Sequence, residues 1–351
     1  MLRVYYGTKN RSGSQGIYTG TLDPQTGQLS EPQLAAEAEN PGFLAISLSG
    51  DFLYAVANGE KGQRIVSYTI DRESGKLDEL NSQEVGGVNP CHLSIGPNDR
   101  FVVYANYTGG SCGRMPLADD GTLQPRSSFF QHSGSSEINP SRQEAPHPHS
   151  AMVHPDGHLV MVPDLGQDKI RIYRVTGDSP RMIPNETPVA EMPAGGGPRH
   201  VTFHPNRVWM YSNNELASSV SFLELDTTTG TTDLKQTIST LPSDFDGENL
   251  TAEILVHPSG SFLYCSNRGH DTIASFSIDP SDGSLTSTGH ATSGGKTPRN
   301  FGITPNGDYL VSANQDSDDV ITHTINPTTG RLTPTGHAIK VPHCICVRFL
   351  E

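Results

Sequence analysis

Short stretches in which hydrophobic and polar residues alternate recur along the whole chain. Segments 52–58 (FLYAVAN), 101–106 (FVVYAN) and 309–314 (YLVSAN) are typical, and segments 64–71 (RIVSYTID) and 272–279 (TIASFSID) show the same alternation. A period of two places successive side chains on opposite faces of a strand. The 36 Gly and 26 Pro residues favour many tight turns between such short elements. The pattern therefore predicts an all-β protein.

These segments belong to a repeat that runs through the sequence. Each copy begins with an anchor residue, usually Pro, followed by a short hydrophobic strand, a polar turn and a second strand that usually ends in Asn or Asp. Seven copies align, 44 to 58 residues apart, with anchors at Pro41, Pro90, Pro148, Pro198, Thr251, Pro298 and Pro342. Repeats of about 40 to 50 residues are typical of propellers and solenoids.

The third strand of a copy usually leads into a turn of the form Asp/Asn-x-x-x-Gly-x-Leu. Residues 23–29, 71–77, 279–285 and 326–332 have this form. The Asp or Asn opens the turn, Gly takes the position with positive φ, and Leu starts a fourth, outer strand. Four strands per repeat make a propeller blade. We therefore predict a seven-bladed β-propeller with four-stranded blades, a single domain covering residues 1–351.

The two ends of the chain supply complementary parts of one repeat. Residues 3–29 match the second, third and fourth strands of a blade but lack a first strand, whereas residues 341–350 match a first strand with nothing after it. Pairing these segments closes the ring and removes the open edges that an unclosed array would present. We therefore predict one blade shared between the N- and C-terminal strands.

One interval between anchors is longer than the others. The 58 residues between Pro90 and Pro148 include a segment, 126–148, that is rich in Ser, Pro and charged residues. We predict a long loop there that leads to the top of blade four. Long loops in compact domains are commonly functional, but the sequence is equally compatible with an indifferent surface insertion.

The charge of the chain restricts its partners. A formal net charge of -14 argues against nonspecific binding to nucleic acid or anionic lipid, which requires clustered Lys and Arg. No segment has the 18 or more apolar residues of a membrane span, and residues 1–10 lack the hydrophobic region of a signal peptide. We therefore expect a cytoplasmic protein that acts on a small molecule; its oligomeric state is left open. The cysteines are scattered and their number, five, is odd, so we predict that they are reduced and serve packing: Cys91, Cys112, Cys265, Cys344 and Cys346.

Equivalent positions of the seven copies should form rings around the propeller axis. The residues directly after the anchors are Gly42, Cys91, His149, Arg199, Ala252, Arg299 and His343. The next residues are Phe43, His92, Ser150, His200, Glu253, Asn300 and Cys344. The residues that follow the second strands are Lys9, Gly59, Tyr107, Leu165, Glu215, Arg268 and Gln315, and they reach the same mouth if a hairpin joins the first two strands at the other end.

Positive charge is concentrated in these rings although the protein is acidic. The cations are Lys9, Arg199, Arg268, Arg299 and the histidines, whereas the acidic positions are Glu215 and Glu253. Clustered like charges usually persist where an anion is bound, so we predict an anion site at the channel mouth. The alternative is that the side chains extend into solvent at a wide mouth. Glu215 is then either a salt-bridge partner or a base kept ionised by neighbouring Arg.

The histidines divide by position. His149 and His200 occupy ring positions and are the functional candidates, whereas turn-stabilising roles are predicted for the histidines of the His-Pro turns, His154, His204 and His257. His132 and His147 lie in or beside the long loop and are undecided. The pair His147 and His149 has the only clean spacing for zinc, and no metal is expected.

Segments 146–157 (PHPHSAMVHPDG), 162–170 (VPDLGQDKI), 195–206 (GGGPRHVTFHPN), 213–220 (NNELASSV) and 297–310 (TPRNFGITPNGDYL) carry a family resemblance. Together with residues 139–150 (NPSRQEAPHPHS), they resemble the lactonase family of seven-bladed propellers over essentially the whole chain. That family includes the propeller-type 6-phosphogluconolactonase and the fungal 3-carboxy-cis,cis-muconate lactonizing enzyme. The resemblance implies an active site at the channel mouth whose catalytic and anion-binding positions match His149, Arg199, Glu215 and Arg268. His200 and Arg142 are further candidates, and no role is implied for His343.

The leading hypothesis is hydrolysis of a sugar lactone, 6-phosphoglucono-δ-lactone, in the pentose phosphate pathway and without a cofactor. Either Glu215 or His149 is the base, and Arg199 binds the carbonyl and the oxyanion. Arg268, together with Arg299 or Lys9, is predicted to hold the phosphate. One alternative is a carboxymuconate cycloisomerase that uses the same cations. The other is a propeller that serves as a binding scaffold, although its 7% aromatic content provides few residues for a protein interface.

Overall fold

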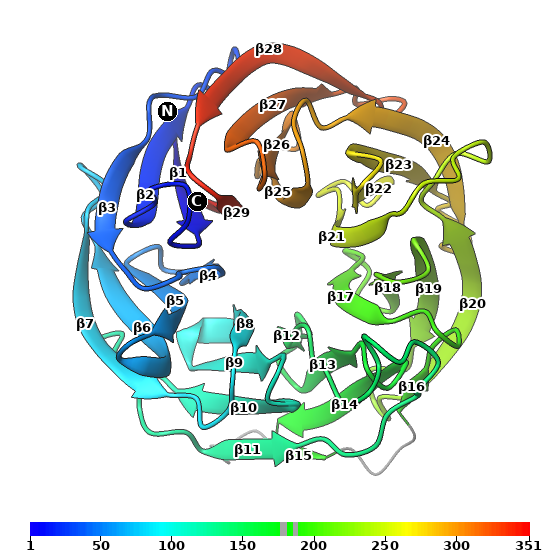
Figure 1. Cartoon of the computed structure of the whole chain (residues 1–351), viewed down its shortest axis with the longest axis horizontal. Helices are drawn as coiled ribbons and strands as arrows, with labels where there is room; N and C mark the ends of the chain where they lie inside the picture. The colour runs from blue at the N-terminus through cyan, green and yellow to red at the C-terminus, as the bar shows by residue number, and fades with distance from the viewer. Residues whose placement is uncertain (176–180, 185–188) are drawn as a thin grey trace.

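The structure is a computed structural model that describes residues 1–175, 181–184 and 189–351. Within these ranges the strands form seven antiparallel sheets arranged as blades around a central axis (Figure 1). In every blade the first strand lies at the axis and the last at the rim, as the repeat predicted. The apolar side chains of the strands pack between neighbouring blades, so the core forms a ring of clusters around the channel.

The strands follow one another through the blades in chain order. Blade 1 contains β29 (Cys344–Leu350), β1 (Leu2–Thr8), β2 (Gly16–Leu22) and β3 (Gln33–Glu37). Blade 2 contains β4 (Leu44–Ile46), β5 (Phe52–Gly59), β6 (Gly62–Ile70) and β7 (Leu77–Glu84). Blade 3 contains β8 (Pro90–Ile95), a 3-10 turn η1 (Pro97–Asp99), β9 (Phe101–Asn106), β10 (Ser111–Pro116) and β11 (Ser128–Gln131).

The remaining blades repeat this plan. Blade 4 contains β12 (Met152–Val153), β13 (Leu159–Asp164), β14 (Lys169–Val175), β15 (Met182–Pro184) and β16 (Ala190–Glu191). Blade 5 contains β17 (Pro198–Phe203), β18 (Trp209–Asn214), β19 (Ser219–Leu225) and β20 (Thr232–Ser239). Blade 6 contains β21 (Leu250–Val256), β22 (Phe262–Arg268), β23 (Thr272–Ile278) and β24 (Leu285–Thr292), and blade 7 contains β25 (Pro298–Ile303), β26 (Tyr309–Asn314), β27 (Asp319–Ile325) and β28 (Leu332–Lys340).

The termini close the ring as predicted. Strand β29 pairs antiparallel with β1 over the register Arg3↔Leu350 to Thr8↔Cys344, and β1 pairs on its other side with β2. Figure 1 shows the blue N-terminal strands and the red C-terminal strand side by side in this blade. The backbone groups of β1 are therefore paired on both sides, and the edge that β29 covers is not exposed.

The predicted turns also join neighbouring blades. The turn glycines Gly75 and Gly283 have φ angles of 77° and 79°, which favour Gly. The carbonyl oxygen of Gly283 accepts a hydrogen bond from the Tyr211 hydroxyl of the preceding blade at 2.8 Å. Tyr5 makes the equivalent bond to Gly75 at 3.1 Å. Each turn thus caps its own blade and holds the adjacent one.

The histidines of the His-Pro turns have the structural role that the sequence predicted. Nδ1 of His204 accepts the backbone N–H of Asn206 at 3.1 Å, so its Nε2 carries the proton and donates to the Gly260 carbonyl of the next blade at 3.0 Å. His154 and His257 make the same pair of contacts. These side chains lie in the turns between first and second strands, at the end of the blades opposite the channel site.

One expectation was wrong in part. Residues 128–131 are not loop but the strand β11, which pairs with β10 and completes blade 3. The Ser-rich composition obscured this strand, whose burial is only partial. Residues 132–148 then lead from the rim of blade 3 to the channel. Among the described residues no helix has the length and hydrophobicity needed to cross a membrane.

Candidate active site

A cavity of about 540 Å³ opens at one mouth of the central channel. Its size is typical of small-molecule sites. Every side chain that the sequence singled out for catalysis or binding lines this cavity: Lys9, Arg142, His149, Arg199, His200, Glu215, Arg268 and Arg299. Seven of these eight come from aligned positions of the repeat, which therefore meet in space as predicted, and Arg142 comes from the long loop.

The backbone of the first strands explains how these side chains reach the cavity. The pairing between the first two strands of blade 5 shifts in register between Pro198 and Val201, and blades 3, 6 and 7 have a shift at the corresponding place. Such bulges re-aim side chains at the end of a sheet. In blade 5 the shift falls on Arg199 and His200, so both face the channel instead of alternating between the two faces.

Glu215 lies at the centre of a cluster of arginines. Its Oε1 accepts a hydrogen bond from Nη2 of Arg142 at 2.6 Å, and its Oε2 lies 2.9 Å from Nε of Arg199 and 3.1 Å from Nη2 of Arg268. The Glu215 side chain is 3% exposed, so solvent contributes little to holding this charge. We call Arg142, Arg199, Arg268 and Glu215 the paired arc.

The electrostatics of the paired arc fix the charge of Glu215. Burial by itself raises the pKa of this carboxyl, but Arg268, Arg199 and Arg142 outweigh it and lower the pKa to about 2. Glu215 is therefore a carboxylate at neutral pH and a weak proton acceptor. The sequence left two roles open for Glu215, a salt-bridge partner or a base. The geometry favours the salt-bridge partner.

The imidazole ring of His149 lies beside this carboxylate. Its Nε2 is 3.8 Å from Oε2 of Glu215, and its buried Nδ1 has no hydrogen-bond partner among the described residues. Burial, together with the nearby charges of Arg199, His200 and Arg299, holds the pKa of His149 well below its usual value. The imidazole is neutral at pH 7, which leaves it able to accept a proton.

The cations on the other side of the cavity are not paired with an acidic side chain in the part of the chain that the structure describes. Lys9 follows β1, Arg11 lies in the next turn, and Arg299 lies in β25 of the adjacent blade 7. Within the described ranges none of these side chains forms an ion pair or a side-chain hydrogen bond. Burial, then Arg268 and Arg199, lower the pKa of Arg299 to about 9. We call Lys9, Arg11 and Arg299 the open arc.

Arg11 is a cavity residue that sequence reasoning missed. The alignment took only the residue that follows each second strand, which in blade 1 is Lys9. The turn at residues 9–15 carries Arg11 back over the same mouth, where burial, Arg299 and Arg11 itself lower the pKa of Lys9. The sequence did contain a signal for Arg11, namely a basic residue two positions after the aligned Lys9.

The rest of the wall is uncharged. Blades 2 and 3 contribute the amides of Asn40, Asn58 and Asn89 and the ring of Tyr107. The Tyr107 hydroxyl accepts a hydrogen bond from Nη2 of Arg142 at 3.2 Å, which connects this wall to the paired arc. Such amides can donate to and accept from hydroxyl groups of a ligand.

Several aligned positions do not reach the cavity. His92, Glu253 and His343 are buried but are not part of its wall. His147 is occupied by Glu144, 3.0 Å from its Nε2, and by the Tyr107 carbonyl, 3.1 Å from its Nδ1. The described part of the chain contains no group of three or more His, Cys, Asp or Glu side chains arranged to hold a metal.

Comparisons with known proteins agree with this geometry. Residues 3–349 match the family described as "Lactonase, 7-bladed beta-propeller". The 6-phosphogluconolactonase of Bacillus subtilis is 35% identical over 347 residues, which cover 99% of this chain and 98% of that protein. The 6-phosphogluconolactonase of Formosa agariphila is 32% identical over 82% of each chain. The structure of a periplasmic gluconolactonase from Pseudomonas aeruginosa superposes with a TM-score of 0.93 at 28% identity, covering 100% of this chain and 99% of that one.

Proposed function

Because the chain belongs to the family of seven-bladed β-propeller lactonases, we propose that its channel site hydrolyses a sugar lactone, 6-phosphoglucono-δ-lactone, to the open-chain acid. The relatives named 6-phosphogluconolactonase support lactone hydrolysis, and the open arc supports the phosphorylated substrate. Buried or half-buried cations without counter-ions are costly unless an anion completes them. Lys9 and Arg299 are half-buried and, like the exposed Arg11 beside them, form no ion pair within the described residues; this is the observation that carries the proposal.

His149 and the paired arc supply the reaction chemistry. A water molecule attacks the lactone carbonyl while His149 takes its proton, and the carbonyl oxygen becomes an oxyanion that faces Arg199. The ring C–O bond then breaks, and the proton passes from His149 to the leaving oxygen. A positioned base contributes about 10² to 10⁴-fold, and one oxyanion donor about 10² to 10³-fold.

Glu215 organises this group and is not its base. Both of its carboxylate oxygens face arginines, and its pKa of about 2 makes it a poor acceptor for the proton of a water molecule, whereas Nδ1 of His149 has no partner among the described residues. Its carboxylate instead fixes Arg199 and Arg268 in place and neutralises part of their charge. Of the two bases that the sequence allowed, we therefore assign His149.

The remaining walls of the cavity bind the phosphate and the sugar hydroxyls of the substrate. The open arc binds the phosphate, for which the planar guanidinium groups of Arg11 and Arg299 can form bidentate contacts. Asn40, Asn58 and Asn89 line the part of the wall that would lie against the sugar hydroxyls. A cytoplasmic location belongs to this proposal too, because a phosphorylated sugar does not cross a bilayer unaided.

The test is a coupled assay with freshly generated 6-phosphoglucono-δ-lactone, measured against its spontaneous hydrolysis. Wild type should accelerate acid formation, seen also as proton release, and Arg199→Ala should lose about 10² to 10³-fold of that acceleration. Arg207→Ala is the control, because Arg207 is exposed on the same blade and pairs only with the surface residue Asp156. No acceleration by wild type would reject this substrate. Formation of a lactone from an added open-chain carboxymuconate, without proton release, would support the cycloisomerase instead.

A further inference from the structure

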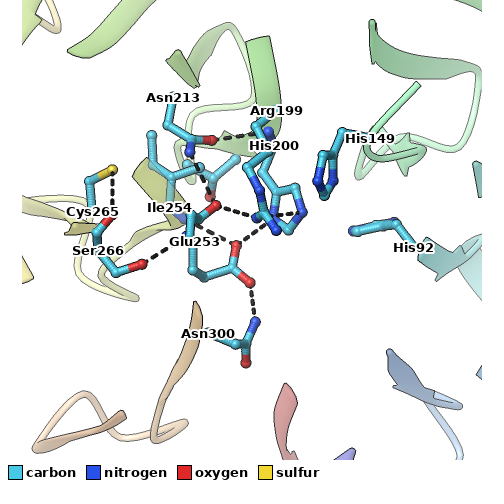
Figure 2. A network of polar contacts seen from close by, with 12 residues as sticks. His92, His149, Arg199, His200, Asn213, Glu253, Ile254, Cys265, Ser266 and Asn300 are labelled. Carbon is cyan, nitrogen blue, oxygen red and sulfur yellow. Dashed lines mark hydrogen bonds and ion pairs between the residues drawn. The ribbon is translucent and has the colours of Figure 1, made fainter. Parts of the chain in front are cut away.

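Behind Arg199, three buried polar side chains from consecutive blades meet at the propeller axis. His200 of β17, Glu253 of β21 and Asn300 of β25 occupy the same position after their anchors and are at most 4% exposed. Figure 2 shows the Glu253 carboxylate between the His200 ring and the Asn300 amide, with Arg199 beside His200. Nothing in the proposed reaction uses Glu253 or Asn300 directly.

The orientation of the Asn300 amide is fixed from both ends. Its Oδ1 accepts the backbone N–H of Val347 at 2.8 Å, which leaves the NH₂ group to face Glu253. That NH₂ group donates to Oε2 of Glu253, while Oε1 accepts the backbone N–H of Ile254 at 3.0 Å. Both of these partners therefore donate hydrogen bonds to Glu253. An ionised carboxylate, which can only accept hydrogen bonds, fits this position.

This polarity determines the proton position on His200. Nδ1 lies 2.8 Å from Oε1 of Glu253 and must donate to it, because an ionised carboxylate cannot donate. Burial, then Arg199, lower the pKa of His200 to about 4, so the ring is neutral and its Nε2 carries a lone pair. Nη1 of Arg199 donates to that Nε2 at 3.0 Å and to the Ala252 carbonyl at 2.5 Å.

The guanidinium of Arg199 is thus held on two sides. Nη1 is used by His200 and Ala252, and Nε faces Glu215 at 2.9 Å. Among the described residues Nη2 has no partner, and Arg199 lines the cavity. If His200 carried its proton on Nε2 instead, two N–H groups would face each other and the inner contact of Arg199 would be lost.

We propose that Glu253 is a positioning residue, which acts with Asn300 to hold His200 as the Nδ1–H tautomer so that its Nε2 fixes the Arg199 guanidinium in the active site. The proposal rests on the proposed lactonase function for its kinetic consequences only. It also assigns His200 to positioning, since both of its ring nitrogens are occupied by protein groups. Carboxylates behind ligand histidines fix tautomers in the same way in metal sites.

Substitutions that exchange donors and acceptors test this polarity directly. In Glu253→Gln, the new NH₂ group faces either the Asn300 NH₂ group or the Nδ1–H of His200, so one contact is lost. In Asn300→Asp, two carboxylates meet in a buried site. The double variant Glu253→Gln, Asn300→Asp restores the pattern, because the introduced amide can donate to the introduced carboxylate while its oxygen still accepts from His200.

We expect Glu253→Gln to lower kcat by about 10 to 100-fold with little change in KM, because Arg199 acts on charge that develops in the transition state. Asn300→Asp should also lower kcat, and the double variant should recover most of the loss. Melting temperatures of all three variants separate this effect from unfolding. A double variant as slow as Glu253→Gln, although folded to the wild-type melting temperature, would overturn the proposal.

A spectroscopic measurement tests the tautomer without any activity. Wild-type protein labelled with ¹⁵N in its histidines should show His200 protonated on Nδ1 and not on Nε2, with the signal assigned by its loss in His200→Gln. Protonation on Nε2 in wild type would refute the proposal even if every variant were inactive. A wild type that shows the Nδ1–H tautomer but no lactonase activity would instead reject the proposed function.

Discussion

The two arcs of the channel mouth contain the same kinds of residue in opposite electrostatic situations. The arginines of the paired arc surround the Glu215 carboxylate, whereas Lys9, Arg11 and Arg299 of the open arc contact no acidic side chain among the described residues. A counter-ion fixes the geometry of a cation and compensates its charge. The paired arc is therefore suited to hold groups in place for a reaction, and the open arc is suited to bind an anion that arrives from solution.

Deleting the C-terminal strand β29 should have the largest effect on the channel mouth, because Lys9 and Arg11 of the open arc then lose their support. A chain without residues 342–351 lacks β29 and exposes the edge of β1. We expect it to be insoluble or to melt at least about 10 °C lower in a thermal unfolding scan. A chain lacking only the exposed Glu351 is the control, and an unchanged melting temperature of the longer deletion would refute the ring closure.

Removing the counter-ion converts the paired arc into a second open arc. Glu215→Gln leaves Arg142, Arg199 and Arg268 facing one another in a buried site, which should destabilise the protein by about 3 to 5 kcal/mol. We also expect kcat to fall by about 10² to 10³-fold, because Arg199 loses its orientation. Denaturant unfolding and initial rates measure the two effects. Glu191→Gln, at an exposed ion pair with Lys169, should change neither.

The pH dependence of stability tests whether the ionised Glu215 carboxylate is the source of the stability that Glu215→Gln loses. Its folded pKa of about 2 lies below the usual value of 4.5, so the stabilisation is complete above about pH 4.5 and is lost as the pH falls through 2. The difference in unfolding free energy between wild type and Glu215→Gln should therefore be constant near neutrality and shrink below pH 4.5. A difference that grew towards acid pH would contradict this assignment.

Neutralising the open arc should affect binding more than chemistry. Lys9→Met and Arg299→Gln each remove a charge-assisted contact to phosphate, a loss of about 1.5 to 3 kcal/mol. The KM for the phosphorylated lactone should therefore rise by about 10 to 100-fold, with kcat within a few-fold of wild type in steady-state assays. Lys235→Met removes a surface cation that is paired with Glu224 and Asp233, and it should leave KM unchanged.

Much of the fold and of the site followed from the sequence because both are repetitive. Aligning the seven copies placed His149, Arg199, Glu215 and Arg268 in two rings at one mouth of the channel, and the complementary ends predicted the shared blade. The alignment could not show the register shifts that bring consecutive residues such as Arg199 and His200 to the same face. Nor could it show which cations find a counter-ion, since that depends on side-chain contacts between blades.

The charge of the open arc also reaches the reaction site, and its expected effect on the pH dependence of kcat/KM is the smallest of those predicted here. Arg299 of the open arc is one of the cations that lower the pKa of His149. The kcat/KM of wild type should therefore stay level as the pH falls from 8 through 6.5 and decline only at lower pH, where His149 becomes protonated. In Arg299→Gln the pKa of His149 rises, so this decline should move to higher pH by less than about one unit. A nonphosphorylated lactone is the substrate of choice, because its charge does not change over this range.

The division between the two arcs is tested most directly by the ratio of kcat/KM for 6-phosphoglucono-δ-lactone to that for glucono-δ-lactone, measured in wild type and Arg299→Gln. Wild type should prefer the phosphorylated substrate, and Arg299→Gln should lower that preference by about 10-fold or more while retaining its rate on glucono-δ-lactone. Equal losses on both substrates would place Arg299 in the reaction itself and contradict the separation of binding from chemistry.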